Sequence, residues 1–312
     1  MTFKLFIDGA AGTTGLEIRE RLSQRPEFEM AILPDDRRKD AEARRDALNG
    51  CDVAILCLPD EAARDAVASI ENDTTRVIDA STAHRVADGW TYGCPELVGE
   101  RSIAKASRIA NPGCYPTGFL ALIAPLIADD ILPRDWPYTV HAVSGYSGGG
   151  NALIDRFDTD RTIGWRGYGL AMGHKHLNEM QHYADLTYPP VFAPAVVDAH
   201  RGMVVEVPLN LAAMGKDTRA SDIHRTLHEF YASSPIVTIA PMDLMPDELL
   251  LRTDATPWDG MILHVFADDE SGHVRLIARL DNLGKGASGA VVQSLNLIAG
   301  LPQETGLNLD AR

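Results

Sequence analysis

The chain has few cysteines, lacks long hydrophobic runs, and shows no internal repeat or low-complexity segment. Its four cysteines form no CxxC pair and no zinc-binding spacing, so we interpret them as reduced thiols of a cytoplasmic protein. The longest apolar runs, such as residues 119–128, are too short to cross a bilayer. Residues 1–7 lack the basic and apolar regions of a secretory signal peptide. These absences indicate neither a membrane protein nor a disulfide-stabilised secreted one.

Basic residues are also scarce relative to acidic ones. The chain has 29 Lys and Arg against 44 Asp and Glu, a formal net charge of −15. Such a charge argues against nucleic acid or an anionic membrane as a partner, because both are negatively charged. It does not exclude a small anionic substrate in a locally basic pocket. The length of 312 residues favours two domains, and a hydrophobic content of 45% is ordinary for a globular protein.

The chain opens with an expected strand, a glycine-rich turn and an expected helix. The strand covers residues 4–8, the helix follows from Leu16, and Gly9, Gly12 and Gly15 lie between them. Glycines let a backbone approach a pyrophosphate closely, and a helix N-terminus offers N–H donors to it. The GxxGxxG spacing differs from the GxGxxG dinucleotide fingerprint, and a plain tight turn is the alternative. Its place after a first strand favours a nucleotide site.

Further apolar strands alternate with helical segments in the first third of the chain. Such alternation predicts a parallel sheet with crossover helices. The expected strands are 29–33, 52–58 and 76–79, and the expected helices are 40–48 and 60–70.

The second expected strand is followed by charges of both signs. Asp35 and Asp36 lie where an NAD-binding domain carries an acidic residue for the ribose, but Arg37, Arg38 and Lys39 follow at once. Basic residues there accommodate the 2′-phosphate of NADP. A solvated charge run is the alternative. We favour NADP.

Beyond about residue 113 the pattern changes to longer alternating strands, which favour an antiparallel or mixed sheet. The expected strands are 138–143, 203–211, 262–267 and 274–280, and the expected helices are 117–128, 221–233 and 286–301.

The segment 110–118, Ala-Asn-Pro-Gly-Cys-Tyr-Pro-Thr-Gly, carries a candidate nucleophile. Pro116 is typical of a first helical turn, which puts Cys114 just before a helix. The positive end of a helix dipole favours a thiolate, the form of cysteine that attacks an acyl carbon. The alternative is a small buried hydrophobe.

Two more clusters could carry chemistry. His174, His176 and Glu179 could form a metal site, a base with its orienting carboxylate, or the start of a surface helix. HxHxxE is not a zinc spacing, so a Cys114–His pair is the better interpretation. The loop 144–150, Ser-Gly-Tyr-Ser-Gly-Gly-Gly, could direct N–H groups and hydroxyls at a phosphate or oxyanion, or be a plain surface loop.

Together these motifs resemble the N-acetyl-γ-glutamyl-phosphate reductases, over nearly the whole chain. The segment Ser81-Thr82-Ala83-His84-Arg85 resembles the shorter subgroup; longer members commonly carry an aspartate near His84 and a proline where Asn178 stands. The matching motifs are the three glycines of 9–15, Tyr92-Gly93-x-Pro95-Glu96-Leu97, Asn111 to Thr117, Ser144-Gly145-x-Ser147-Gly148, His174-Lys175-His176-x-x-Glu179 and Lys285-Gly286-Ala287-x-Gly289.

The resemblance implies an α/β architecture like that of glyceraldehyde-phosphate dehydrogenase. It implies an NADP-binding Rossmann domain at 1–112, on which a C-terminal helix within 285–312 packs back. A mixed-sheet α+β catalytic and oligomerisation domain would span 113–284, in a homodimer or homotetramer. The implied reaction is reduction of an acyl phosphate to an aldehyde by NADPH in arginine biosynthesis. It proceeds through a Cys114 thioester, with His174 as acid and base; the choice of His174 over His176 comes from the family.

The expected site follows from the motifs and the resemblance, with no metal expected. The cofactor is expected at Gly9, Gly12, Thr13, Thr14, Gly15, Arg37, Arg38, Ser81, Ser144, Gly145 and Gly286. The substrate is expected at Arg85, Asn111, Ser147, His176 and Glu179. Two alternatives stay open: a related reductase of aspartyl phosphate or N-acetyl-aminoadipyl phosphate, and a non-catalytic NADP-sensing Rossmann protein.

Overall fold

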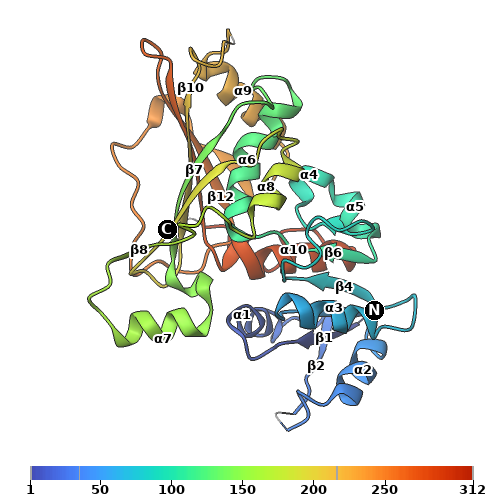
Figure 1. Cartoon of the computed structure of the whole chain (residues 1–312). Helices are drawn as coiled ribbons and strands as arrows, with labels where there is room; N and C mark the ends of the chain where they lie inside the picture. Colours follow the sequence, from blue (N-terminus) through green and yellow to red (C-terminus); the bar gives the residue numbers. More distant parts are fainter. Residues whose placement is uncertain (1, 35, 216, 311–312) are drawn as a thin grey trace. The chain divides into compact units, whose positions relative to one another are not determined.

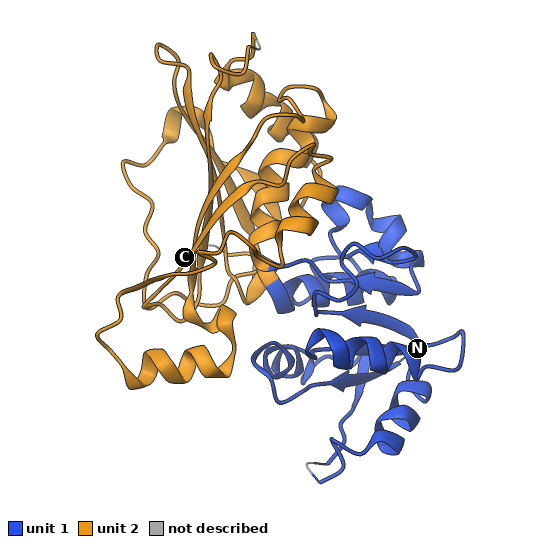
Figure 2. Cartoon of the chain, viewed as in Figure 1, with its two compact units in different colours: residues 1–113, 287–307 blue, residues 114–286, 308–312 orange. Residues whose placement is uncertain are grey.

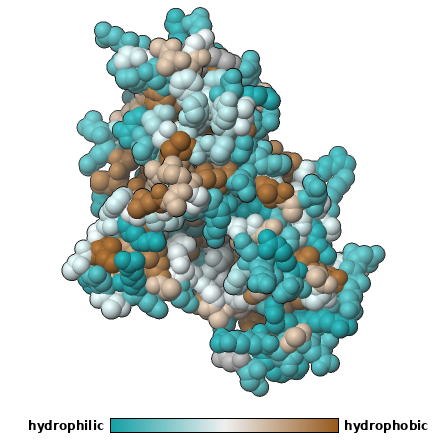
Figure 3. Space-filling view, viewed as in Figure 1, coloured by the Kyte–Doolittle hydropathy of each residue, from teal (hydrophilic) through white to brown (hydrophobic). Residues whose placement is uncertain are grey.

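The computed structural model describes residues 2–34, 36–215 and 217–310. Asp35, which stands where an NAD-binding domain carries an acidic residue, lies outside the described residues. The chain divides into two compact units (Figure 2). Unit 1 comprises residues 1–113 and 287–307, and unit 2 comprises residues 114–286 and 308–312. The face seen in Figure 3 is mostly hydrophilic, with scattered hydrophobic residues.

Unit 1 is built on a parallel sheet, as the alternating pattern predicted. Its strand order is β2-β1-β3-β4-β6-β5, and every paired strand runs parallel to its neighbour. The short strands β5 and β6 were not predicted, because two or three residues show no periodicity. The strands are β1 (Phe3–Asp8), β2 (Phe28–Ala31), β3 (Val53–Leu56), β4 (Arg76–Asp79), β5 (Thr91–Tyr92) and β6 (Arg108–Ala110).

Helices complete unit 1, and one of them comes from the C-terminal part of the chain. The apolar stripe of α10 (Gly289–Ile298) includes Val291 and Leu295, which share a core cluster with Ile55 and Ile78 of the sheet. This helix also contacts α5 and α1. The other helices of unit 1 are α1 (Thr13–Leu22), α2 (Ala41–Asn49), α3 (Asp60–Ala68), α4 (Pro95–Val98) and α5 (Glu100–Lys105).

Unit 2 is built on a mixed sheet, as predicted, with strand order β11-β12-β13-β10-β7-β9-β8. β7 runs parallel to β9 and β11 parallel to β12, whereas the remaining pairs are antiparallel. Figure 1 shows the long strands of this sheet crossing unit 2. The strands are β7 (Thr139–Gly145), β8 (Trp165–Gly167), β9 (Val191–Val197), β10 (Met203–Asn210), β11 (Val237–Ile239), β12 (Met261–Asp268) and β13 (His273–Leu280).

One face of this sheet is covered by α6 (Cys114–Ala128) and α9 (Ala220–Tyr231). At Gly118 the helix approaches the sheet so closely that an added Cβ would lie 2.8 Å from Val205 Cγ2. The face toward the helices carries Val205 and Ala278, and strand alternation sends their neighbours to the opposite face. The remaining helical segments of unit 2 are α7 (Asn151–Thr159), α8 (Leu177–Tyr183), η1 (Tyr146–Gly149), η2 (Met242–Leu244) and most of the π-helical turn η3 (Gly284–Ser288).

The helix α6 contains a proline whose missing N–H is compensated from another helix. Pro125 cannot donate to the carbonyl of Ala121, four residues earlier. The buried Tyr231 at the end of α9 donates its hydroxyl to that carbonyl instead, at 3.0 Å. The proline is therefore tolerated near the end of a long buried helix.

We expect Tyr231→Phe to lower the free energy of unfolding by about 1–3 kcal/mol, because it leaves a buried carbonyl unsatisfied. Urea denaturation monitored by circular dichroism measures this change. Tyr188→Phe is the matched control, since the Tyr188 side chain is exposed. Equal stabilities of the two variants would contradict the expectation.

Candidate active site

The glycine-rich turn after β1 has room for no side chain at two positions. Gly9 has φ +87°, and a Cβ there would lie 2.2 Å from the Cys57 carbonyl oxygen. A Cβ on Gly15 would lie 2.5 Å from the Gly9 carbonyl oxygen. Gly12 is the N-cap of α1 and gives no side-chain cap, and Thr13 and Thr14 are the first helical residues. The backbone of the turn is therefore not covered by side chains where it meets the N-terminus of α1.

The basic run after β2, Arg37, Arg38 and Lys39, is exposed. The Arg37 N–H donates to the Pro34 carbonyl, and the Arg37 carbonyl accepts the Asp40 N–H. Asp40 then caps α2 by accepting from the Ala43 N–H at 2.8 Å. The run thus occupies the expected place after the second strand, on a solvent-exposed turn.

Another arginine, which sequence reasoning missed, lies close to the glycines. Arg44 of α2 binds the carboxylate of Asp8 through Nε and Nη2, with distances of 2.8–3.2 Å. Asp8 is buried, ends β1 and immediately precedes Gly9. The sequence gives no signal for this ion pair, because Asp8 ends β1 and Arg44 lies on α2, the second helix after that strand.

After β4 a short loop is organised by the fully buried carboxylate of Asp79. Ser81 donates its hydroxyl to Asp79 at 2.7 Å, and His84 Nδ1 lies 2.6 Å from the same oxygen. The His84 ring stacks on Trp90 with centroids 4.1 Å apart. The Ser81 hydroxyl also accepts the Ala83 N–H. Ser81, an expected cofactor ligand, therefore has internal partners for its hydroxyl.

Arg85 and Asn111 are both buried and lie together. Arg85 Nε donates to the Asn111 carbonyl at 3.0 Å, and Nη2 donates to the Ala80 carbonyl at 3.3 Å. The Asn111 amide nitrogen donates to the Ala287 carbonyl. Its Oδ1 is buried and has no hydrogen-bond partner within the described part of the chain. That oxygen can accept an N–H from a ligand.

Cys114 is the first residue of α6, so the helix begins at the cysteine itself and not after it, as the expected range 117–128 had it. Pro116 lies in the first turn, where its missing N–H is harmless. The thiol-bearing residue is half-buried, and a Cβ on Gly286 would lie 3.0 Å from the Cys114 Cβ. The Gly286 backbone can approach the cysteine only because it has no side chain.

The other three cysteines are less suited to act as a nucleophile, because two have raised pKa values and the third is buried. Burial raises the pKa of Cys51 to about 11, and burial together with the Asp79 and Asp8 carboxylates raises the pKa of Cys57 to about 12. Cys94 is buried, and its sulfur lies 3.4 Å from a Glu96 carboxylate oxygen. Cys114 differs from all three because it is the first residue of a long helix, the 15-residue α6, whereas Cys94 is the N-cap of the four-residue α4.

Two tyrosines form a hydrogen-bonded chain beside the cysteine. Tyr168 donates its hydroxyl to the Tyr115 oxygen at 3.3 Å, and Tyr115 donates to the Ala195 carbonyl at 3.0 Å. Burial raises the pKa of Tyr115 far above its usual range and that of Tyr168 to about 12. Both phenols are therefore neutral at pH 7. Sequence reasoning did not select them, because a tyrosine gives no motif.

The histidine pair lies against Tyr115, the residue after the cysteine. The Tyr115 ring centroid is 6.2 Å from that of His174 and 5.9 Å from that of His176. The His176 backbone N–H donates to His174 Nδ1 at 3.1 Å. Since Nδ1 accepts a hydrogen bond, the neutral His174 ring carries its proton on Nε2. His174 can therefore donate from Nε2.

The remaining expected residues of unit 2 are buried. Ser144 donates its hydroxyl to the Gly145 carbonyl, and Ser147 accepts from the Asn282 amide at 2.9 Å. A Cβ on Gly145 would lie 2.7 Å from the His200 carbonyl oxygen, so this segment packs backbone against backbone. Glu179 lies buried in the first turn of α8. Sequence reasoning missed Asn282, and it did not select the buried Lys285 next to Gly286.

Two searches bear on other classes of function. Within residues 2–34, 36–215 and 217–310, no three His, Cys, Asp or Glu side chains gather in a way that could hold a metal ion. None of the helices in this described part of the chain is both long and apolar enough to cross a membrane.

Two family matches together cover most of the chain. Residues 4–106 match the family described as semialdehyde dehydrogenase, NAD binding domain. Residues 114–282 match the family described as semialdehyde dehydrogenase, dimerisation domain.

Curated relatives extend this result. Proteins named N-acetyl-gamma-glutamyl-phosphate reductase from Nostoc sp., Chelativorans sp. and Rhizobium meliloti are 47%, 45% and 46% identical to the chain. The alignments cover 97%, 96% and 95% of this chain and 99%, 98% and 98% of the relatives.

Solved structures share the fold at low identity. Aspartate semialdehyde dehydrogenase II from Vibrio cholerae superposes with a TM-score of 0.71 at 17% identity, covering 96% of this chain and 99% of that one. Aspartate semialdehyde dehydrogenase with NADP from Candida albicans has a TM-score of 0.60 at 14% identity, with the same coverage. The expected fold class is confirmed, and the chain belongs to the semialdehyde dehydrogenase family and, within it, to the N-acetyl-γ-glutamyl-phosphate reductases.

Proposed function

We propose that this protein reduces N-acetyl-γ-glutamyl phosphate to N-acetylglutamate 5-semialdehyde with NADPH, releasing phosphate, as a step of arginine biosynthesis. The observation that carries the proposal is Cys114 at the first residue of α6, against the Gly286 backbone and next to Tyr115, whose ring lies near the histidine pair, in a member of this reductase family. We assign cofactor binding to unit 1 and catalysis and assembly to unit 2. A homodimer or homotetramer is proposed from the match of residues 114–282 to a dimerisation domain. A cytoplasmic location is proposed from the four cysteines, which form no CxxC pair.

The residues of unit 1 fit a dinucleotide. A Cβ on Gly9 or Gly15 would fill the turn, so the turn is shaped for a group that contacts backbone directly. The pyrophosphate would lie at the N-terminus of α1, over Gly12, Thr13 and Thr14. Ser81 would line the same site from the loop after β4. Ser144, Gly145 and Gly286 are proposed on the unit 2 side.

Arg44 joins Arg37 and Arg38 as a proposed ligand of the 2′-phosphate. It lies against Asp8 at the carboxyl end of β1, and such strand ends form the nucleotide site of parallel sheets. Asp8 accepts hydrogen bonds from Nε and Nη2 of Arg44 and so fixes the guanidinium in place. The Nη1 nitrogen has no hydrogen-bond partner among the described residues. A fixed cation loses less side-chain entropy on binding than one on an exposed turn.

We expect Arg44→Gln, and Arg37→Ala with Arg38→Ala, to weaken binding of 2′,5′-ADP by about one to two decades. Each removes a charge-assisted hydrogen bond of about 1.5–3 kcal/mol. Isothermal titration measures this, and the KM for NADPH should rise while that for NADH hardly changes. Arg45→Gln is the control for Arg44, because it is adjacent, exposed and paired with Glu71. Equal KM values for the two cofactors in the unmodified protein would rule out 2′-phosphate recognition.

The first chemical step requires a thiolate at Cys114. The N-terminus of α6 stabilises negative charge on the sulfur, which attacks the γ-carbonyl carbon. The carbon–oxygen bond to phosphate then breaks, the phosphate leaves and takes up a proton, and a thioester remains on Cys114. His174 Nε2–H can donate a hydrogen bond to the oxyanion formed in this step.

The second step converts the thioester to an aldehyde. When bound, the nicotinamide supplies a hydride to the thioester carbon. His174 Nε2–H stabilises the resulting thiohemiacetal oxyanion, which collapses and returns the electron pair of the carbon–sulfur bond to Cys114. Acceptance of the thiol proton at Nε2 would require the other tautomer and loss of the bond from the His176 N–H. The geometry therefore supports a donor role for His174 more strongly than a base role.

Buried polar groups are proposed to hold the substrate. Arg85 supplies a cation for its carboxylate or phosphate, and Asn111 Oδ1 can accept its acetamido N–H. Ser147, His176 and Glu179 are proposed on the unit 2 side, where all three are buried.

A steady-state assay tests the reaction. Phosphate, N-acetylglutamate semialdehyde and NADP⁺ should produce NADPH, measured by its absorbance. Aspartate semialdehyde and the N-acetyl-aminoadipate semialdehyde serve as competing substrates. A higher kcat/KM with either would replace the proposed substrate by that of a sibling enzyme, and no activity with any would favour a non-catalytic protein.

A further inference from the structure

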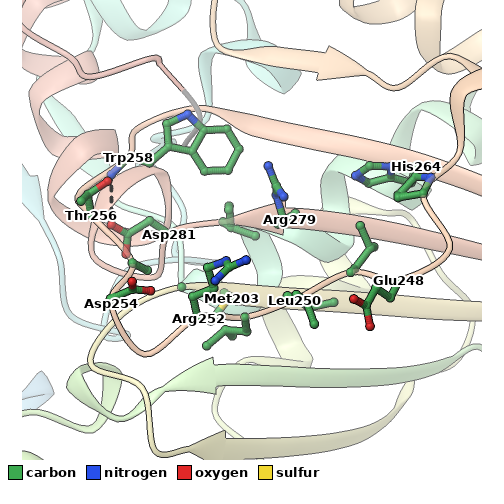
Figure 4. A pocket seen from close by; sticks show the side chains of 17 residues that line it. Met203, Glu248, Leu250, Arg252, Asp254, Thr256, Trp258, His264, Arg279 and Asp281 are labelled. Carbon is green, nitrogen blue, oxygen red and sulfur yellow. Dashed lines mark hydrogen bonds between the residues drawn. The ribbon is translucent and has the colours of Figure 1, made fainter.

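One cluster of titratable side chains outside the residues assigned above belongs to unit 2. His264 and Arg279 line a cavity on the face of the sheet opposite to α6 and α9 (Figure 4). This sheet lies within the match to a dimerisation domain, so we assign the cluster to the subunit contact proposed above. Another cluster lies in unit 1, where Asp79 and His84 belong to the segment that leads to Arg85.

The carboxylate of Asp79 is the centre of the unit 1 cluster. Asp79 ends β4, and its side chain is 0% exposed, so it needs hydrogen-bond donors around it. Ser81 supplies two of them, its N–H at 2.9 Å and its hydroxyl at 2.7 Å. His84 supplies another from Nδ1 at 2.6 Å. The chain from residue 79 to residue 84 therefore folds around one carboxylate.

The His84 side chain is fixed by a hydrogen bond and by packing. Because an ionised carboxylate can only accept, Nδ1 of the ring carries the proton of the bond to Asp79. The ring also stacks on Trp90, with centroids 4.1 Å apart and an angle of 10° between the two planes. The backbone at residue 84 is therefore held in one place.

Arg85, the next residue, reaches back to the ends of two strands. Its Nε donates to the Asn111 carbonyl at 3.0 Å, and its Nη2 donates to the Ala80 carbonyl at 3.3 Å. The Asn111 N–H in turn donates to the Asp79 carbonyl at 2.7 Å. The guanidinium can return to these carbonyls only if the chain turns at a fixed point, and His84 fixes the chain directly before it.

The first half of this loop has an anchor of its own. Thr82 donates its N–H to Asp60 Oδ1 at 2.9 Å and its hydroxyl to Oδ2 of the same carboxylate. Neither this contact nor the two bonds from Ser81 to Asp79 involves His84. Loss of the His84 side chain should therefore release the loop near residue 85 and leave the proposed cofactor ligand Ser81 in place.

We propose that His84, through its bond to Asp79, is a positioning residue that holds the Arg85 guanidinium where the anionic substrate binds. This role rests on the proposed function, in which Arg85 binds the carboxylate or the phosphate of the substrate. His84 then acts through Arg85 alone, and not on the cofactor.

Two replacements of His84 separate the hydrogen bond from the packing. His84→Phe keeps a ring on Trp90 but offers no donor to Asp79, whereas His84→Asn places an amide nitrogen near the Nδ1 position. In the steady-state assay, Arg85→Gln should raise the KM for phosphate or for the semialdehyde at least about tenfold. His84→Phe should raise the same KM severalfold, and His84→Asn should restore most of the loss.

The KM for NADP⁺ and a double variant distinguish positioning from a general loosening of the loop. The KM for NADP⁺ should hardly change in His84→Phe, because Ser81 keeps its bonds to Asp79. Addition of His84→Phe to Arg85→Gln should raise the substrate KM no further, because no guanidinium is left to position. His228→Phe, at an exposed position of α9, is the matched control and should leave all KM values unchanged.

Several results would overturn this role of His84. They are unchanged KM values in His84→Phe or in Arg85→Gln, equal losses in His84→Phe and His84→Asn, an equal rise in the KM for NADP⁺, and additive effects in the double variant.

A crystal structure of His84→Phe provides a readout that does not depend on turnover. Arg85 Nε should no longer lie within hydrogen-bond distance of the Asn111 carbonyl, and an unmoved guanidinium would overturn the positioning role. Inactivity of the unmodified protein would instead contradict the proposed reaction, and the crystal structure would still decide whether His84 positions Arg85.

Discussion

Replacement of Cys114 by serine should lower kcat by several orders of magnitude while the fold and cofactor binding persist. A serine hydroxyl is a far weaker nucleophile and a poorer leaving group than a thiolate, so both formation and collapse of the covalent intermediate suffer. The half-buried side chain at the start of α6 loses little packing in this exchange. Turnover is measured in the reverse assay, and circular dichroism and 2′,5′-ADP titration report on fold and cofactor site.

Alkylation provides the independent readout for the same cysteine. At pH 8, Cys51 and Cys57 remain thiols, because their pKa values of about 11 and 12 lie well above that pH. Iodoacetamide should therefore label Cys114 first, and peptide mass spectrometry identifies the site. Cys94→Ser, which removes a buried thiol outside the proposed site, is the matched control and should keep its activity. Faster labelling of another cysteine, or an active Cys114→Ser variant, would remove the assignment.

Replacement of His174 should have the second-largest effect. His174→Asn cannot place an N–H where Nε2 was, so we expect kcat to fall by about 10²–10³, as when an oxyanion donor is removed. His174→Gln can place its amide N–H near the Nε2 position and should retain more activity than His174→Asn. The bond from the His176 N–H to Nδ1 is the structural basis for this difference.

The pH profile and a chelator separate the possible roles of His174. A hydrogen-bond donor predicts partial rescue by glutamine with an unchanged shape of the kcat profile. Equal loss in both variants, together with a missing limb in the profile, would instead establish proton transfer by the ring. Activity that disappears with a chelator and returns with zinc would revive a metal role for the His174–Glu179 cluster.

Much of the fold could be predicted because its longest elements carry strong periodicity. Arg76–Asp79 is a strand with the predicted bounds, and the mixed sheet of unit 2 follows from the alternation in β10, β12 and β13. The helices α7 and α8 were not predicted, since they are short and only partly buried. Strand β9 was also missed, because Pro194 interrupts its pattern.

The candidate site was predictable where chemistry is encoded locally. The glycine turn, Cys114 and the histidine pair stand in short motifs, and the structure places each at the end of a strand or the start of a helix. Arg44 and Asn282 were missed because their roles depend on partners far away in sequence. Arg44 meets Asp8 across 36 residues and Asn282 meets Ser147 across 135.

The bond from Tyr231 to the Ala121 carbonyl makes two distant positions of the sequence interdependent. The tyrosine hydroxyl donates to the carbonyl that loses its helical partner because residue 125 is a proline. In a relative with an alanine at that position, the helix would satisfy its own carbonyl, and phenylalanine would serve as well at position 231. Proline at 125 and tyrosine at 231 should therefore be exchanged together during divergence. If the tyrosine were replaced before the proline, the protein would lose the full free energy of unfolding that an unsatisfied Ala121 carbonyl costs. Replacement of the proline first would be nearly neutral.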